Sequence, residues 1–410
     1  VRSRRQRQMC IRDRAYITDF IPRSNTDHNT PFYGYSPLVW EKGNSEFEQV
    51  DNTNMQIVYL GQQSVWKIND NNGNNFTFFK KLGQFDHSYW EGSILKEDRD
   101  TNSEISIALG ATKTTEILTF IPIELNNHIN IDINRPNQDS ISYIKAAAYS
   151  ATFILQRAFC SSEDIDPDEI TILDMNKYFF ESSANAIFQI TLADKLPNGS
   201  GFVRKLKDEI IDNQFLNSLF LNQSTNKFIK YLVSDKHASQ CKTSCSKCLS
   251  VFTNMPFHGL LDWRLGLSYL RTFLDPNYVA GLDGNFDFFE LKSLNNDIID
   301  LKIILTDYIK PGFANLDIEL IDYEKNNIHG LHIKTNIPAT KDKIIFFTHP
   351  LWNIEDDAWD ETILLDAYED ITFNNPDREF HNTPIFWADT FNLSRRPGKV
   401  YEDLVSSIRI

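Results

Sequence analysis

Cysteine is scarce in this chain, with five residues in a sequence of 410. So small a number excludes the disulfide framework that is typical of small secreted domains. The sequence also contains no run of about 18 apolar residues, which a membrane-spanning helix would need. No G-x4-G-K-[S/T] loop is present, so the sequence gives this chain no phosphate loop for ATP hydrolysis. These absences predict a soluble, cytoplasmic protein without an ATPase motor of its own.

A surplus of positive charge is missing as well, because the formal net charge is -15. That value counts against a protein coated with phosphate-binding lysines, so contact with nucleic acid would have to come from a local basic face. The hydrophobic content of 41% is sufficient for a sizeable core. A chain of this length predicts about two or three domains.

The first 14 residues are basic and polar, unlike everything that follows. One interpretation is a basic arm for nucleic acid. The amino-acid sequence of residues 1–14, however, resembles a translated sequencing-adapter remnant of the kind found at the start of some metagenomic open reading frames. We favour this second interpretation and leave Cys10 out of the metal argument. On that interpretation the natural protein continues upstream and the present chain is its C-terminal part.

Three of the five cysteines, Cys241, Cys245 and Cys248, fall within eight residues, and His237 lies four residues before the first of them. Three thiolates and an imidazole are the ligand set of a closed tetrahedral zinc site. The close spacing lowers the entropy cost of bringing the ligands together, and zinc would hold a short loop that has little core of its own. The alternatives are free thiols, or a disulfide with one thiol left over.

The fourth ligand is open at this stage. His258, ten residues after Cys248, competes with His237, and Cys160 is a third candidate if the long helix that carries it packs beside the loop. Proximity in sequence is the only advantage of His237. The pattern predicts one structural Zn²⁺ per chain, with no open coordination position for a catalytic water.

Residues 15–135 are predicted to be β-rich. A strand, turn and strand are expected over 65–79, because the asparagine-rich segment 69–75 suits a hairpin loop. A second pair of strands is expected at 105–110 and 115–121.

Residues 136–280 are predicted to form a helical zinc-binding domain. Small residues in a helix that begins near residue 141 would allow close packing. A strand is expected at 186–193, followed by a glycine-containing turn at 194–201 in which Ser200 caps the next helix. Such a turn could hold a phosphate on its amides, although purely local reasons produce the same pattern more often.

A further helix is expected from Leu260, where apolar residues spaced by three and four form a core-facing stripe as far as Leu274. Arg264 and Arg271, together with Ser268, fall on a different face. These arginines could contact a DNA backbone or the carboxylates of a partner, and an ordinary solvated face is the alternative.

Residues 281–410 are predicted to form an α/β unit with the element order of a restriction-endonuclease-type core. The second and third predicted strands lack the aspartate and the Glu-x-Lys motif that would hold catalytic metal ions, which indicates a non-catalytic unit. The nearby Glu290 and Lys292 have Glu-x-Lys spacing but open a helix, so we interpret them as a chance match. The predicted elements are a helix at 291–308, strands at 316–323, 328–335 and 343–351, a helix at 357–368 and a strand at 384–391.

Several ordered segments resemble the MrfA-type zinc-binding domain, in the version found in DrmB, a component of the DISARM anti-phage system. The resemblance implies a helicase partner of the DrmA type and engagement of phage DNA by the pair. It also implies that the three cysteines match the family's zinc motif, with His237 as the fitting fourth ligand. Two departures matter: without a phosphate loop, ATP hydrolysis cannot be credited to this chain, and the chain is more acidic than a stand-alone DNA binder should be. The matching segments are 108–116, 194–202, 237–248, 254–267, 349–352 and 389–397.

We therefore expect a multi-domain α+β protein that acts as a non-catalytic, zinc-stabilised accessory subunit. It would dock on a DNA helicase and support DNA engagement in bacterial anti-phage defence. The residues proposed for contact with the partner or with DNA are Lys113, Asn198, Gly199, Arg264 and Arg271.

Two other hypotheses stay open. In the first, the C-terminal unit cleaves nucleic acid with His349, Asp389 and Glu290 in a rearranged site. In the second, the chain is the C-terminal zinc-binding part of a single-chain DNA-repair helicase.

Overall fold

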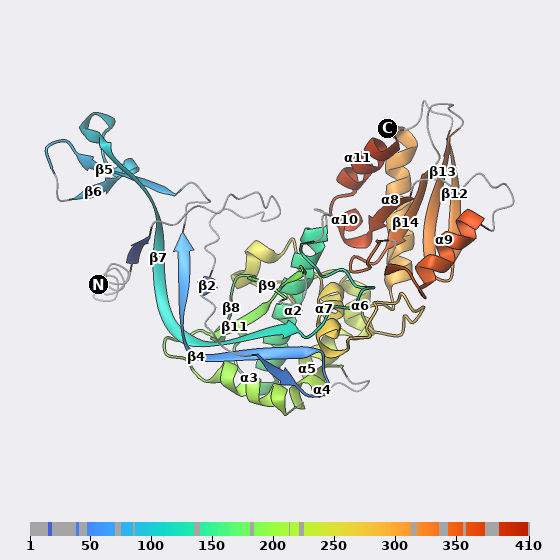
Figure 1. The fold of residues 1–410 in the computed structure, drawn as a ribbon, viewed down its shortest axis with the longest axis horizontal. Helices are drawn as coiled ribbons and strands as arrows, with labels where there is room; N and C mark the ends of the chain where they lie inside the picture. Colours follow the sequence, from blue (N-terminus) through green and yellow to red (C-terminus); the bar gives the residue numbers. More distant parts are fainter. Residues whose placement is uncertain are drawn as a thin grey trace.

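The fold of this chain combines helices with three sheets, of nine, two and four strands among the residues described (Figure 1). This arrangement confirms the predicted multi-domain α+β class. None of the described helices is long and apolar enough to cross a bilayer. The computed structural model describes residues 15–18, 38–40, 47–69, 75–84, 87–134, 140–180, 184–212, 214–220, 225–312, 318–335, 343–355, 358–373 and 385–408.

The largest sheet is organised around one long strand, β7 (Arg99–Pro122), which is 24 residues long. β4 (Met55–Asn69) pairs antiparallel with it over most of its own length, and Figure 1 shows both strands curving from beneath the helices toward the N-terminal strands. The other strands of this sheet are β1 (Ala15–Thr18), β2 (Leu38–Trp40), β3 (Glu48–Val50), β5 (Phe76–Lys81), β6 (Ser88–Trp90), β8 (Ile170–Ile172) and β11 (Ile190–Asp194).

The turn expected between 105–110 and 115–121 does not exist, because β7 continues through both segments. The intervening residues include Thr112 and Thr114, whose β-branched side chains favour extended backbone. The strand also pairs with β4 without interruption from residue 109 to residue 115. The prediction of two strands here was therefore wrong.

The hairpin predicted over 65–79 was also wrong, although both of its strands form. β4 and β5 each pair antiparallel with β7, with Asn69 opposite Leu109 and Phe76 opposite Ile107. The two strands thus follow one another along β7. Most of the asparagine-rich segment between them, 70–74, lies outside the described residues.

The helical middle of the molecule is built on α2 (Ser140–Glu163), which confirms the helix predicted from residue 141. α7 (Trp263–Leu274) packs directly against it. A Cβ atom added to Gly266 would lie 2.7 Å from the Ser150 Cβ and 2.8 Å from the Ser150 carbonyl carbon. The predicted close packing through small residues is therefore confirmed.

α7 is not the amphipathic surface helix that the sequence pattern suggested. Its apolar stripe is buried, but Ser268 is buried too, and its hydroxyl lies 3.1 Å from the Tyr278 hydroxyl. The helix is covered by α2 on one side and by the loop segments before and after it on the others. A separate solvated face for Ser268 was thus a wrong prediction, because helical periodicity does not reveal how many sides a helix has covered.

The strand predicted at 186–193 is divided in two. β10 (Ala186–Phe188) pairs with β9 (Lys177–Phe179), whereas β11 pairs with β7 and β8. Short helices follow and lead to the cysteine cluster: α3 (Phe202–Ile211), α4 (Gln214–Phe220), α5 (Lys227–Leu232) and α6 (Asp235–Gln240).

The C-terminal unit has the predicted element order, extended by two helices that the sequence analysis did not predict. β12, β13 and β14 are antiparallel neighbours, and β15 is parallel to β14. Figure 1 shows α8 and α9 flanking this sheet, with α10 and α11 beside α8. The elements are α8 (Leu294–Gly312), β12 (Ile318–Lys325), β13 (Ile328–Thr335), β14 (Lys343–Thr348), α9 (Ile363–Phe373), β15 (Ile385–Asp389), α10 (Thr390–Arg395) and α11 (Pro397–Ile408).

One continuous apolar core runs through the regions predicted as 15–135, 136–280 and 281–410, since its buried residues extend from Val50 to Leu404. Hydrogen bonds also cross between these regions. The Trp352 indole donates to the Ala280 carbonyl at 2.9 Å, and the Asn130 amide donates to the Leu351 carbonyl at 2.8 Å. The three predicted regions are therefore packed on one another through a shared core.

Candidate metal centre

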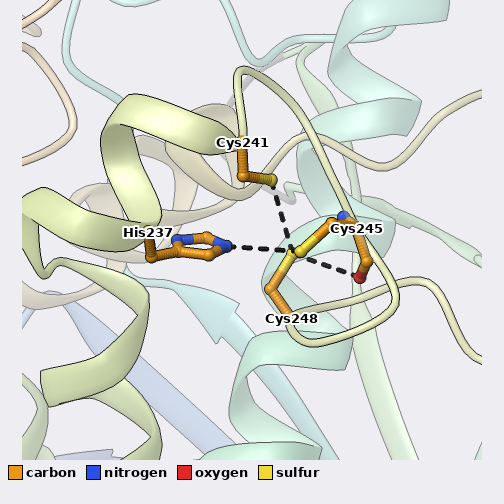
Figure 2. Close-up of side chains that lie close together, drawn as sticks. All are labelled: His237, Cys241, Cys245 and Cys248. Atoms are coloured by element: carbon orange, nitrogen blue, oxygen red, sulfur yellow. Dashed lines mark hydrogen bonds between the residues drawn. The ribbon is translucent and has the colours of Figure 1, made fainter.

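Three thiols and one imidazole converge in the loop that follows α6 (Figure 2). Their four ligand atoms all lie within 4.8 Å of one another. The sulfurs of Cys241 and Cys248 are 3.8 Å apart, and the His237 Nε2 is 3.6 Å from the Cys245 sulfur. A tetrahedral zinc ion with bonds of about 2.3 Å to sulfur and about 2.0 Å to nitrogen gives edges of about 3.8 and 3.5 Å. The four residues can thus hold one metal ion.

Local structure places each ligand. Ser234 caps α6 by accepting a hydrogen bond from the His237 amide, so the histidine lies in the middle of a short, defined helix. Cys241 is the C-cap residue of the same helix. The Cys248 amide donates to the Cys245 carbonyl at 3.0 Å, which closes the turn between the last two cysteines. This tight fold brings sulfurs from both ends of the loop to one point.

The imidazole of His237 is already oriented for metal binding. Its Nδ1 lies 2.7 Å from the Leu232 carbonyl oxygen, which can only accept, so Nδ1 carries the proton. The lone pair is then on Nε2, the nitrogen that faces the cysteines (Figure 2). A hydrogen bond of this kind fixes the tautomer and orientation of a metal-ligating histidine.

Hydrogen bonds within the cluster also favour deprotonation of one of its thiols, that of Cys248. The hydrogen bond from the Cys241 thiol lowers the pKa of Cys248 to about 5, and the Cys245 amide, 3.0 Å from the Cys248 sulfur, acts in the same direction. The same interaction raises the pKa of Cys241. Because a thiolate is the form that binds metal, Cys248 is the most readily available anionic ligand of the cluster.

The two competing fourth ligands lie elsewhere. The His258 Nε2 is within hydrogen-bonding distance of the Val251 carbonyl (2.9 Å) and the Asn254 side-chain oxygen (3.0 Å). Cys160 is buried in the apolar core, where burial raises its pKa to about 12. The structure therefore selects His237 from the three candidates.

The first turn of α7 holds the metal-site loop in place. The Trp263 indole donates to the Cys241 carbonyl at 3.0 Å, and its amide donates to the Thr243 carbonyl at 2.9 Å. Arg264 donates to the carbonyls of Cys241 and Ala238 at 3.2 and 3.1 Å. Its guanidinium group also lies 4.4 Å from the centre of the Trp263 ring system. Arg264, proposed as a partner or DNA contact, thus has both of its terminal nitrogens hydrogen-bonded within the chain.

Arg271 is used internally as well. Its guanidinium group forms an ion pair with Glu290, whose side chain is fully buried, and lies 4.3 Å from the centre of the Phe288 ring. The Tyr278 hydroxyl donates to the same carboxylate at 3.4 Å. Glu290, one of the three residues of the nuclease hypothesis, is therefore bound within the structure.

The other proposed contact residues meet where the 194–201 turn packs on β7. Lys113 donates to the carbonyls of Asp194 and Lys195 at 3.0 and 2.7 Å, and burial lowers its pKa. The Asn198 amide donates to the Thr114 carbonyl at 2.7 Å. The strand and the turn proposed for partner or DNA contact are neighbours in the structure, and these polar groups bind one another.

The buried carboxylate of Asp194 organises this turn, and the sequence analysis missed it. It accepts hydrogen bonds from the amides of Ser200 and Gly201, both at 2.6 Å, and from Val203 at 3.0 Å. The N-cap residue of α3 is Gly201, without a side-chain cap, so the prediction of Ser200 as the cap was wrong. The amides that could have held a phosphate already bind a carboxylate. An acidic residue before a glycine-rich turn is the only signal that the sequence offers for this role.

His349 and Asp389 lie at the ends of two adjacent parallel strands, with Thr348 opposite Asp389. Asp389 caps α10, accepting from the Asn392 amide at 2.8 Å and its side-chain nitrogen at 2.7 Å. Burial lowers the pKa of His349 to about 3, so its ring is neutral near pH 7. Within the described residues, the one group of three or more histidine, cysteine or acidic side chains close enough to hold a metal ion is the cluster around His237.

We compared the chain with protein families, curated proteins and solved structures, and only the solved structures gave a match. No family model matches the sequence, and no curated protein matches it. Among solved structures, the chain is similar to the DUF1998 helicase MrfA bound to DNA, with 11% sequence identity and a TM-score of 0.31. The matched region covers 58% of this chain and 25% of that helicase.

Proposed function

We propose that this chain is a zinc-stabilised, non-catalytic accessory subunit that docks on a DNA helicase and supports DNA engagement in anti-phage defence, as the resemblance to DrmB implies. The observation that carries the proposal is the closed cluster of His237 and three cysteines. Four protein donors fill a tetrahedral zinc site and leave no position for a reacting water. The metal would therefore stabilise structure, and the role of the chain would be to bind.

Zinc is the ion that this donor set favours. Three sulfurs and one imidazole nitrogen are soft or borderline donors, and tetrahedral geometry with sulfur ligands is typical of zinc or of iron–sulfur clusters. His237, Cys241, Cys245 and Cys248 would each supply one bond. The ion would then fix the loop whose carbonyls bind Trp263 and Arg264.

The segments that carry the resemblance also meet in pairs. The 108–116 strand contacts the 194–202 turn through Lys113 and Asn198. The metal-site loop accepts a hydrogen bond from Trp263, which starts α7 within the 254–267 segment. Segments 349–352 and 389–397 lie at the ends of the adjacent strands β14 and β15. These contacts are consistent with the idea that the segments resemble those of DrmB because together they form one structural framework.

A nuclease is the second candidate, favoured by the adjacent positions of His349 and Asp389. Metal-assisted hydrolysis needs carboxylates that are clustered and available to cations. Asp389 caps a helix, and Glu290 is paired with Arg271. These engagements favour the binding role over cleavage.

The decisive experiment measures metal content and partner binding together. We expect one zinc ion per purified chain, lost in Cys245→Ser and retained in Cys160→Ser and His258→Ala. Co-expression with a DrmA-type helicase should yield a complex with the wild type and with Cys160→Ser, and not with Cys245→Ser. A zinc-bound chain that forms no complex with the helicase, or that hydrolyses DNA alone in the presence of Mg²⁺, would refute the proposed role.

A further inference from the structure

The C-terminal sheet ends in an open edge at β15. Its five residues, Ile385–Asp389, pair with β14 on one side, and β15 is the last strand of the sheet among the described residues. About half of the amide and carbonyl groups of such a strand point away from its single neighbour. No backbone hydrogen bond joins 385–388 to another described segment on that side.

A cavity of about 260 Å³ lies against β15. It touches all five consecutive residues of β15. Because successive side chains of a strand point to opposite faces of the sheet, contact with all five residues includes the backbone of β15. Thr348, His349 and Pro350 line the same cavity, so it lies beside β15 and extends past the end of β14.

The opposite wall of this groove is one face of a helix. Lys399, Val400 and Asp403 of α11 line it, and spacings of four and three place Asp403 on the same side of the helix as Lys399 and Val400. Arg396, the C-cap residue of α10, also lines the groove directly before α11 begins. Aromatic side chains that include Trp352 also line the groove. An edge strand facing a helix, with aromatic side chains nearby, is a shape that accommodates one additional extended chain.

Arg396 gives the groove its charge preference. Its guanidinium group is positioned by hydrogen bonds to the Ser142 hydroxyl (3.2 Å) and the Asn392 side-chain oxygen. No carboxylate in the described part of the chain forms an ion pair with it, whereas Lys399 is bound to Asp403 at 2.6 Å. A half-buried arginine held in this way is available to a carboxylate from outside.

We propose that this groove binds an extended segment of a partner protein, which adds to β15 as a further strand and places an acidic side chain against Arg396. Main-chain hydrogen bonds to the open edge would supply affinity, and the arginine and the aromatic side chains of the lining would supply specificity. The inference is independent of the zinc site and holds whether or not the partner is a helicase. Nucleic acid fits less well, because a phosphate backbone cannot complete a strand ladder.

The test uses the full chain and an array of acetylated nonapeptides with alternating apolar and polar residues. Each peptide is made with glutamate or with lysine at the central polar position, and a third form carries N-methyl groups on alternate amides. Fluorescence anisotropy should show that the best glutamate peptides bind at least about tenfold more tightly than their lysine forms. N-methylation of the strand-pairing amides should abolish binding.

Two variants locate the binding on the groove. Arg396→Glu should reverse the preference in favour of the lysine peptides, and Val400→Trp should block every peptide by filling the groove. Arg204→Glu is the matched control, because it makes the same charge change at a side chain that is 59% exposed on α3. It should leave all affinities unchanged, and circular dichroism confirms that each variant is folded.

Several outcomes would overturn the proposal. One is that no peptide binds with a Kd below about 1 mM, and another is that binding is the same in Val400→Trp as in the wild type. Self-association of the chain that Arg396→Glu abolishes would assign the groove to a second copy. Competition for the groove by a single-stranded oligonucleotide, lost in the same variant, would assign it to nucleic acid.

Discussion

The loop at 241–248 and the turn at 194–201 face the same physical problem and solve it differently. Each is a short polar segment that buries little apolar surface of its own. The loop gathers three sulfurs and an imidazole that could hold one metal ion between them. The turn wraps its amides around the carboxylate of Asp194. On the proposed function, the loop would be organised by a cation from solution, whereas the turn carries its organising anion within the chain.

This difference makes the two segments respond to different conditions. A metal site is assembled only when its thiols are reduced and deprotonated and when the ion is supplied. A buried carboxylate that accepts several amide hydrogen bonds needs none of these conditions. We therefore expect the metal loop to be the conditional part of the molecule and the turn to be permanent.

The largest effect should come from removing the ion. Cys245→Ser, or treatment of the wild type with EDTA, should lower the free energy of unfolding by at least about 4 kcal/mol, the contribution of a ligand present at a thousand times its Kd. Hydrogen exchange should become faster in residues 237–265 and stay unchanged in the 194–201 turn. Cys160→Ser should keep the metal. Equal exchange in both segments after chelation would remove the distinction between them.

Asp194→Asn tests the other segment. The variant replaces a charged acceptor of three amides with a neutral amide, so we expect a loss of about 2–4 kcal/mol in urea unfolding. Metal content should stay at one ion per chain. Asp208→Asn, at a side chain that is 64% exposed, serves as the control and should change stability by less than about 0.5 kcal/mol. Loss of the metal in Asp194→Asn would show that the two segments are coupled.

Gly266→Ala tests the packing beneath the metal loop. The new Cβ would approach the backbone of α2, with the Ala151 nitrogen at 2.9 Å, and neither helix can move without disturbing the core. We expect a loss of about 2–3 kcal/mol, measured by thermal or urea unfolding, because overpacking against backbone cannot be relieved by a rotamer change. An unchanged stability would mean that α2 and α7 are less tightly packed than described.

Gly199→Ala tests the corresponding position in the turn and should have a smaller effect. Gly199 has a φ of +81°, and the new Cβ would lie 2.5 Å from the Glu116 Cγ. That neighbour is a flexible side chain, so the remaining penalty is mainly the left-handed backbone, about 1 kcal/mol. Urea unfolding of both glycine variants gives the ranking directly, and a larger loss for Gly199→Ala would reverse our view of the two segments.

The metal ligands could be predicted because they are close together in sequence. Spacing alone brings Cys241, Cys245 and Cys248 within reach of one ion. The choice of His237 over His258 needed the structure, because it depends on a carbonyl oxygen that fixes one ring and on other acceptors that engage the other. The order of elements in the C-terminal unit was likewise readable from hydrophobic periodicity.

The roles of the charged residues could not be predicted in the same way. Arg264 and Arg271 have the spacing of a solvated helical face, yet their partners are carbonyls near residue 241 and the carboxylate of Glu290. The position of Asp194 before a glycine-containing turn was the only sign that it would bind the first amides of a helix beginning at residue 202. Each of these roles depends on contacts with residues that are too far away along the chain for local sequence patterns to reveal them.

By itself, the sequence determined the features that depend on neighbours along the chain: the sulfur-rich ligand set, the long helix at 140–163 and the strands and helices of the last unit. Only the tertiary structure decided which histidine completes the metal site, that β7 is continuous and that the edge of β15 faces a groove. The physical reason is that helices, strands and ligand spacing arise from local interactions. Burial, hydrogen-bond partners and strand pairing are set by segments that meet only when the whole chain has folded.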